Sequence, residues 1–284
     1  METKQRGSGW SIALVYNLYK LFGFRFIYIL IYPITFFYFL FATNVKDSLK
    51  IYYQQIEKDF NVRVYFEHLR IFANCLVDRF ITKLTDEEYV FAYDDIDIPT
   101  KILNNGCILL HSHFGGWAAS ANMAHITNKI HLVMKEVLLE SIKKIENSKK
   151  NKQNLNNIDL NEGGISVSIK IANALLENDI VAMMGDRASN DKGKKAIYFF
   201  GKLANFNKNP FQIAYKINKP ILVYFIVFQS MKKYKVEYLV IELDKNLKEE
   251  EAVLEAMKKY IKKYEEVIQN YPNQWFNFYD FWKK

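Results

Sequence analysis

The hydrophobic residues of this chain fall into two patterns. Up to about residue 90 they form long apolar stretches, and after Pro99 they form short runs between polar segments. Five of these runs are rich in β-branched residues and bounded by turn formers, which is typical of buried strands. They are residues 107–110, 130–134, 180–184, 221–228 and 238–243. Helical spacing of apolar residues lies between several of them, as in 165–177.

This alternation of strands and helices predicts an α/β fold with a mixed, largely parallel central sheet flanked by helices. Chemistry in such sheets gathers beyond the C-terminal ends of the strands. His111, His113 and Asp186 all follow predicted strands directly. The last predicted helix, 248–270, has one apolar face that we expect to pack on the core. That face consists of Val253, Met257, Tyr260, Ile261, Tyr264 and Ile268.

The apolar stretch 26–42 has 17 residues and no charge. A spanning helix needs ~20 apolar residues, so the stretch is at the short limit. Pro33 in its middle predicts a kink, and the aromatic residues occur along its whole length rather than at its ends. We interpret it as a kinked helix lying in the membrane interface. A spanning helix and a buried core hairpin are the alternatives.

The chain is therefore expected to have a membrane-associated helical segment at 1–46 and an α/β domain at 47–284. The first part of that domain, residues 47–90, is expected to be helical because its apolar residues recur at spacings of three and four. A stretch rich in lysine and asparagine, 143–157, predicts a surface loop.

Charge and aromatic content narrow the choice of partners. The 284 residues include 39 Lys and Arg against 31 Asp and Glu, a net charge of +8, and 16% are aromatic. This balance suits an anionic membrane surface or an acidic carrier protein. No nucleic-acid-binding motif is present, so nucleic acid is not an expected partner. Cys75 and Cys107 lie in apolar runs without metal-ligand spacing, so buried free thiols and no metal site are expected.

The segment from His111 to Ala118, HSHFGGWA, has the composition of a catalytic turn. A histidine near its ordinary pKa can take a proton from a hydroxyl at neutral pH. Gly115 and Gly116 allow close backbone approach and could offer N–H groups to an oxyanion. The alternative is that both histidines are structural.

Two further segments combine polar and aromatic residues. Gly185-Asp186-Arg187 follows a predicted strand, and Arg187 could bind an anionic group or simply form a salt bridge with Asp186. The segment 271–282, YPNQWFNFYDFW, is expected to fold back over the domain and close one side of the site, either as a structural clamp or as part of the site.

These segments resemble the bacterial lipid A biosynthesis acyltransferase family, which belongs to the lysophospholipid acyltransferase superfamily. The resemblance is carried by LYKLFGFRFIYILIYPITFFYFLFA, HFGGW, GDR, YFFGKLANF and PNQWFNFYDFW. It implies acyl transfer from acyl-carrier protein or acyl-CoA to a hydroxyl of a lipid or glycolipid, at the cytoplasmic face of the bacterial inner membrane. No cofactor is expected.

The resemblance also implies roles for residues of this chain. His113 would be the base, with Asp186 and Arg187 as further catalytic residues. The residues expected to bind substrate are His111, Gly115, Gly116 and Trp117.

The sequence departs from the family pattern at one position. The family has a histidine, four residues, and then a carboxylate that orients the imidazole, but here that position is Ala118 counted from His113 and Gly116 counted from His111. Three explanations are open: His113 uses another partner such as Asp186, the acid was replaced to trap an inactive state, or catalysis was lost.

The third explanation makes the protein a non-catalytic lipid- or carrier-binding member of the same fold. A glycosyltransferase is a weaker alternative, since it would need an Asp-x-Asp pair at a strand end. Asp95 and Asp97 form an Asp-x-Asp pair, but they precede Pro99 in an expected loop and do not follow a predicted strand.

Overall fold

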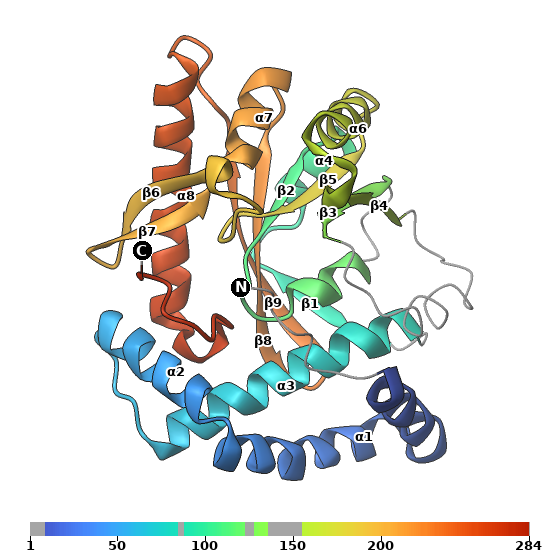
Figure 1. The fold of residues 1–284 in the computed structure, drawn as a ribbon. Coiled ribbons are helices and arrows are strands. Elements are labelled where there is room, and N and C mark those ends of the chain that lie inside the picture. The colour runs from blue at the N-terminus through green and yellow to red at the C-terminus, as the bar shows by residue number, and fades with distance from the viewer. Residues whose placement is uncertain (1–8, 85–87, 123–127, 136–154, 284) are drawn as a thin grey trace.

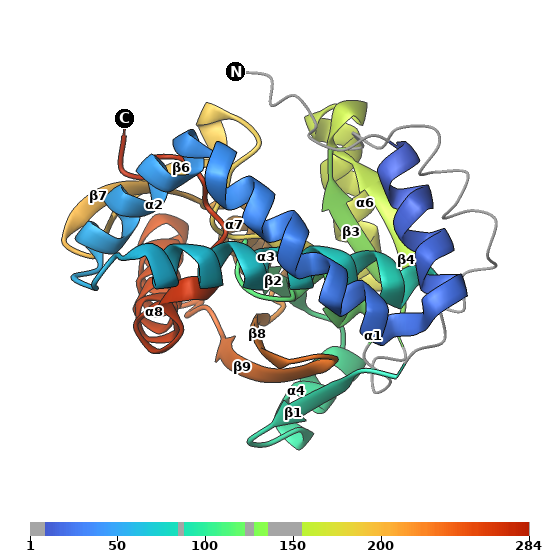
Figure 2. The ribbon, with the colours of Figure 1, turned by 90° about the horizontal axis from the view of Figure 1, so that it is seen from below.

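The computed structural model describes residues 9–84, 88–122, 128–135 and 155–283 (Figure 1). Three helices precede the sheet: α1 (Gly9–Phe41), α2 (Thr43–Gln55) and α3 (Val62–Leu84). α1 runs along the outer side of α3, as Figure 2 shows. The helix predicted for 26–42 is thus part of a longer one. A stretch of 25 residues within it, Asn17–Phe41, is long and apolar enough to cross a membrane.

The position predicted for the kink in α1 is wrong. The departure from helical geometry falls at Gly23, whose φ is 75°, while Pro33 stays inside the helix. Glycine adopts positive φ without the steric cost that other residues meet, so the helix changes direction there. The region 47–90 is also not one helical stretch. Asn61 accepts a hydrogen bond of 3.0 Å from the N–H of Val64 and so caps the start of α3.

Within the described residues, the central sheet has seven strands in the order β1-β9-β8-β2-β5-β3-β4. All neighbours are parallel except β8 and β9, which confirms the predicted mixed, largely parallel sheet. The strands are β1 (Val90–Tyr93), β2 (Ile108–His111), β3 (Ile130–Met134), β4 (Leu155–Asp159), β5 (Ile180–Met184), β8 (Ile221–Ser230) and β9 (Lys233–Ile241).

Helices cover both faces of the sheet. α6 (Gly164–Leu176), α7 (Asn209–Ile217) and α8 (Glu249–Asn270) pack on one face, and α3 and α4 (Asp97–Asn104) pack on the other. Alternate residues of β8 enter the two cores, Val223 and Phe225 on the first face and Tyr224 and Ile226 on the second. A strand buried on both faces reads as a continuous apolar run. The apolar face predicted for α8 is buried, and both cysteines are buried free thiols.

Three features were not predicted from the sequence. β1 and β4 are the edge strands, and β4 begins inside the region predicted as a loop, most of which lies outside the described residues. β6 (Lys194–Phe199) and β7 (Lys202–Asn207) form a separate hairpin. Its turn, Phe200-Gly201, has positive φ at both positions, as tight hairpin turns require. The boundary expected at residue 46 falls inside α2, and stays a prediction.

Candidate active site

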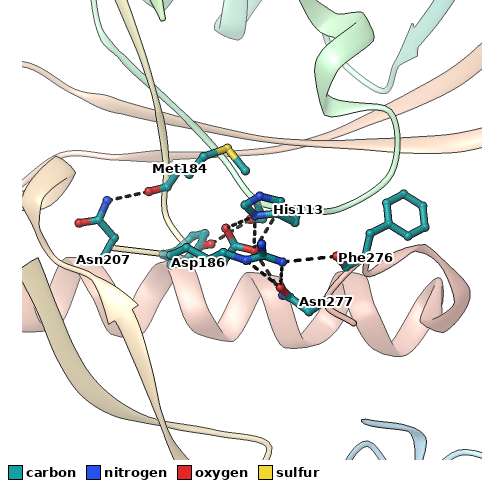
Figure 3. A network of polar contacts seen from close by, with 9 residues as sticks. His113, Met184, Asp186, Asn207, Phe276 and Asn277 are labelled. Atoms are coloured by element: carbon teal, nitrogen blue, oxygen red, sulfur yellow. Dashed lines mark hydrogen bonds and ion pairs between the residues drawn. The ribbon is translucent and has the colours of Figure 1, made fainter. Parts of the chain in front are cut away.

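The site lies where two neighbouring parallel strands end. β2 and β5 pair in parallel, with His111 opposite Met184. The chain then continues into His113 on one side and into Asp186 on the other, so the two residues meet beyond the C-terminal edge of the sheet (Figure 3). This is the position at which α/β sheets place their ligands.

His113 and Asp186 form a closely coupled pair. The His113 Nδ1 lies 3.0 Å from Oδ1 and 3.1 Å from Oδ2 of Asp186. The backbone N–H of His113 donates a further hydrogen bond of 3.0 Å to Oδ2. An ionised carboxylate only accepts, so the proton of a neutral imidazole must sit on Nδ1 and leave Nε2 as the basic nitrogen. The His113 side chain is 27% exposed, whereas that of Asp186 is fully buried.

Buried carboxylates usually become harder to ionise, but Asp186 does not. Burial by itself raises its pKa. The positive charge and hydrogen bonds of His113, together with the charge of Arg187, outweigh burial and hold the pKa below its ordinary value. Asp186 is therefore ionised at neutral pH and can stabilise a protonated His113.

The turn that carries Asp186 is braced from two sides. The Gly185 N–H donates to the His111 carbonyl oxygen at 2.7 Å. Asn207, at the end of β7, donates its backbone N–H to the Gly185 carbonyl at 3.0 Å and its side-chain amide to the Met184 carbonyl at 2.8 Å. Asn207 was not predicted, because nothing local in the sequence indicates that β7 ends beside β5.

The segment 271–282 does fold back and complete the site. The N–H of Phe276 donates to the His113 carbonyl at 2.8 Å. The buried Asn277 accepts a hydrogen bond of 2.9 Å from Arg187 Nε and another from a terminal nitrogen of that guanidinium. Its amide group lies 3.4 Å from Oδ2 of Asp186. Asn277 thus joins Arg187 to Asp186, a role that sequence reasoning missed.

Arg187 is held by this segment. Besides Asn277, it donates to the Phe276 carbonyl at 3.4 Å, and its guanidinium lies 5.1 Å from the centre of the Tyr279 ring. Among the described residues, the hydrogen-bond partners of the Arg187 side chain therefore all lie in the C-terminal segment. The salt bridge to Asp186 considered from the sequence is replaced by a link through Asn277.

The amides of Gly115 and Gly116 are already used. Gly115 N–H donates to the Gln274 carbonyl and Gly116 N–H to the Ile226 carbonyl, both at 2.8 Å. The structure therefore contradicts their expected role as oxyanion donors. The glycines are needed because a side chain does not fit. A Cβ on Gly115, whose φ is 52°, would lie 1.9 Å from the Ile226 carbonyl oxygen, and one on Gly116 would lie 2.2 Å from the Tyr234 ring.

His111 and Trp117 lie beside His113. The Trp117 ring centre is 6.2 Å from that of His113 and 6.4 Å from that of His111. His111 is buried, which lowers its pKa to about 4 and keeps it neutral. Its Nδ1 has no hydrogen-bond partner within the described part of the chain. A role for His111 and Trp117 in binding substrate stays a prediction.

The arrangement defines a class of protein: an α/β protein in which a buried aspartate holds a histidine beyond the C-terminal ends of the parallel strands. Within the described ranges, no group of three or more metal-ligating side chains is present. The family model for bacterial lipid A biosynthesis acyltransferases matches residues 83–284, which include the sheet and the whole site. The chain belongs to this family. A search of curated proteins found no match.

Proposed function

We propose that this protein transfers a fatty acyl chain from an acyl thioester to a hydroxyl of a lipid or glycolipid acceptor. The donor would be acyl-carrier protein or acyl-CoA, and the net charge of +8 favours the acidic carrier. The family match supports acyl transfer of the lipid A type in general. The observation that carries the proposal for this chain is the pair formed by His113 and Asp186.

Asp186 takes the place of the carboxylate missing at Ala118. It contacts His113 Nδ1 with both oxygens and is itself ionised and buried. An acid in this position fixes the tautomer of the imidazole and stabilises its charged form. This favours the explanation in which His113 works with another partner over the two in which activity was lost or trapped.

In the proposed reaction, His113 Nε2 takes the proton of the acceptor hydroxyl while its oxygen attacks the thioester carbonyl carbon. The new C–O bond gives a tetrahedral intermediate with a negative oxygen. That intermediate collapses and the C–S bond breaks. The leaving thiolate then takes from Nε2 the proton that came from the acceptor hydroxyl. Asp186 stays ionised throughout and offsets the positive charge on His113.

The negative oxygen of the intermediate needs a donor other than Gly115 and Gly116. Arg187 is our proposed donor, because it carries a permanent charge next to the pair and its guanidinium has N–H groups beyond those that hold Asn277 and Phe276. His111 and Trp117, which lie beside His113, are the proposed contacts for the acceptor.

We place the reaction at the cytoplasmic face of the bacterial inner membrane, with α1 as the attachment. α1 presents large apolar side chains to solvent, among them Leu21, Phe37 and Phe41, which are 73%, 60% and 66% exposed. Only 22% of its apolar stretch is buried against the protein. A surface of this kind suits a bilayer.

Ala118 still motivates one alternative, a non-catalytic protein that binds lipid or carrier. The two functions differ in turnover. The purified protein would be mixed with acyl-carrier protein loaded with a fatty acid and a bacterial lipid extract, and new acylated lipids would be sought by mass spectrometry. A product formed by the parent protein and absent with His113→Ala supports the enzyme. Lipid binding without product, from acyl-CoA as well, would establish the alternative.

The matched control is His131→Ala. His131 also pairs with an aspartate, Asp179, but away from this site. We expect this variant to keep its transfer activity, while His113→Ala loses about 10²- to 10⁴-fold. Equal activity in parent and His113→Ala would show that His113 is not the base.

A further inference from the structure

A cavity of about 420 Å³ lies between α1, α3 and the turn that joins β8 to β9. It is separate from the His113 site, and none of His111, His113, Asp186 or Arg187 lines it. Its walls include Arg25 and Tyr32 from α1, Arg70 from α3, and Gln229 and Ser230 from the end of β8. Three elements far apart in the sequence thus bring two arginines and two neutral polar side chains to one place.

The two arginines differ in how far their charge is compensated. Arg70 donates from Nε to Glu67 at 2.8 Å, and its guanidinium lies 5.6 Å from the centre of the Tyr32 ring. Glu67 therefore offsets its charge. Arg25 is exposed and makes no hydrogen bond or ion pair with any described residue. The cavity thus contains one uncompensated positive charge, carried by a side chain with five donors.

The end of β8 supplies neutral polar groups. The side chains of Gln229 and Ser230 are exposed and likewise have no hydrogen-bond partner among the described residues. A guanidinium, an amide and a hydroxyl around one cavity suit an anion with several acceptor oxygens, as phosphate has. Carboxylates bind arginine equally well, but phosphate also accepts from the remaining groups.

The cavity is continuous with the apolar face of α1. Arg25, Ile29, Tyr32 and Phe36 follow one another at spacings of four, three and four, so they lie on one side of the helix. Ile29 and Phe36 are 67% and 54% exposed. A ligand that fits this surface has a phosphate at Arg25 and hydrocarbon along the stripe. A free phosphate ion would leave the stripe in water.

We propose that this cavity binds the phosphate of an anionic membrane phospholipid, with Arg25 as its main contact and Gln229 and Ser230 as further donors. The inference rests on the proposed membrane attachment through α1 and not on the chemistry at His113. It assigns to α1 a specific lipid site in addition to general attraction to a charged surface.

The test uses the full chain in an uncharged detergent, titrated with dihexanoyl phosphatidylglycerol, dihexanoyl phosphatidylcholine or inorganic phosphate. We expect saturable binding of phosphatidylglycerol that is tighter than binding of the other two. Arg25→Gln should weaken it about ten-fold or more, and Ser230→Ala about three-fold or more, because each removes a donor to a charged group. Arg25→Lys should fall between the parent and Arg25→Gln, since it keeps the charge but loses the planar fork.

Lys46→Gln is the matched control, because it removes one exposed positive charge that does not line the cavity. It should leave binding of the soluble lipid unchanged. The inference is overturned if binding does not saturate, if Lys46→Gln and Arg25→Gln weaken it equally, or if inorganic phosphate binds as tightly as the lipid. Acyl transfer measured on the same samples separates the two proposals: transfer without lipid binding overturns this one, and lipid binding without transfer overturns the proposed function.

Discussion

Within the described residues, two histidine–aspartate pairs lie at opposite ends of the strands of the central sheet. His113 and Asp186 meet beyond the C-terminal ends of β2 and β5, and His131 and Asp179 meet near the start of β3 and β5, with 2.9 Å between Nε2 and Oδ2. The distances are almost the same, but the surroundings are not. Asp186 is fully buried and receives three kinds of donor, whereas Asp179 keeps 12% of its side chain exposed.

The comparison shows that two similar histidine–aspartate contacts can differ in how many groups hold the carboxylate. At the C-terminal edge, the backbone N–H of His113, its ring and the amide of Asn277 all converge on Asp186. Within the described residues, the His131 ring is the one hydrogen-bond partner of the Asp179 carboxylate. The second pair is also largely buried but rests on this single contact, so it serves as an internal control for the first.

The largest effect is expected from Asp186→Asn. The change keeps the shape but removes the charge that fixes the Nδ1 proton, and in the serine protease case the equivalent change lowers turnover ~10⁴-fold. Asp179→Asn should leave turnover unchanged. Initial rates of acyl transfer for both variants test this, with circular dichroism to show that each is folded. Similar rates in the two variants would remove the distinction between the pairs.

A smaller effect is expected from Asn277→Ala. The side chain joins Arg187 to Asp186, so its loss frees both groups, and misplacement by about 1 Å can cost ~10²-fold in rate. The fold should persist, because Gln274 still ties the segment to β8 through hydrogen bonds of 2.8 and 2.9 Å to Phe228. The measurement is kcat and KM in the transfer assay. An unchanged kcat would reduce Asn277 to a structural clamp.

The third prediction concerns pH. Burial lowers the pKa of His111 from 6.5 to about 4, so the unfolded chain binds a proton at this residue more readily than the folded protein does. Between these values the free energy of unfolding therefore falls as the pH falls, by up to about 3 kcal/mol. His111→Gln should remove this dependence.

Denaturant unfolding of parent and His111→Gln at pH 7 and at pH 4.5 measures it. The stability difference between the two proteins should shift in favour of the variant at the lower pH. A difference that stays constant would show that His111 is not held neutral by burial.

The smallest effect is expected from Ala118→Glu. If the orienting acid were missing, a glutamate there would raise activity. Because His113 Nδ1 is already bound by Asp186, a new carboxylate has no free donor on that nitrogen, and we expect the transfer rate to change little. A large rise would mean that Asp186 does not do the work of the family acid.

The sheet and the proximity of His113 to Asp186 could be predicted because both depend on local signals. Buried strands read as apolar runs, and two parallel neighbours bring whatever follows them to one edge. The same reasoning placed His113 near Asp186. The role of the glycines could not be read in this way, since Gly115 and Gly116 are fixed by contacts with Gln274, Ile226 and Tyr234, which lie more than a hundred residues away.

Edge strands and turn positions were also hidden from the sequence. β4, LNNID, is polar because only one side of it pairs with the sheet. The break in α1 occurs at Gly23 and not at Pro33, because a helix can accommodate a proline when the neighbouring structure tolerates it, whereas a positive φ ends helical geometry outright. Asn277 and Asn207 act through long-range contacts that have no local pattern.

The position of Asn277 has a consequence for how the protein is made. Residues 274–277 are synthesised after all the strands, yet they hold the carbonyl of His113 and reach Asp186. Chains fold from the N-terminus as they emerge from the ribosome. α1 is therefore ready to meet the bilayer early, while the pair stays incomplete until this late segment is released. The chain would therefore reach the membrane before its site is complete. A chain truncated before this segment would reach the membrane without being able to react there.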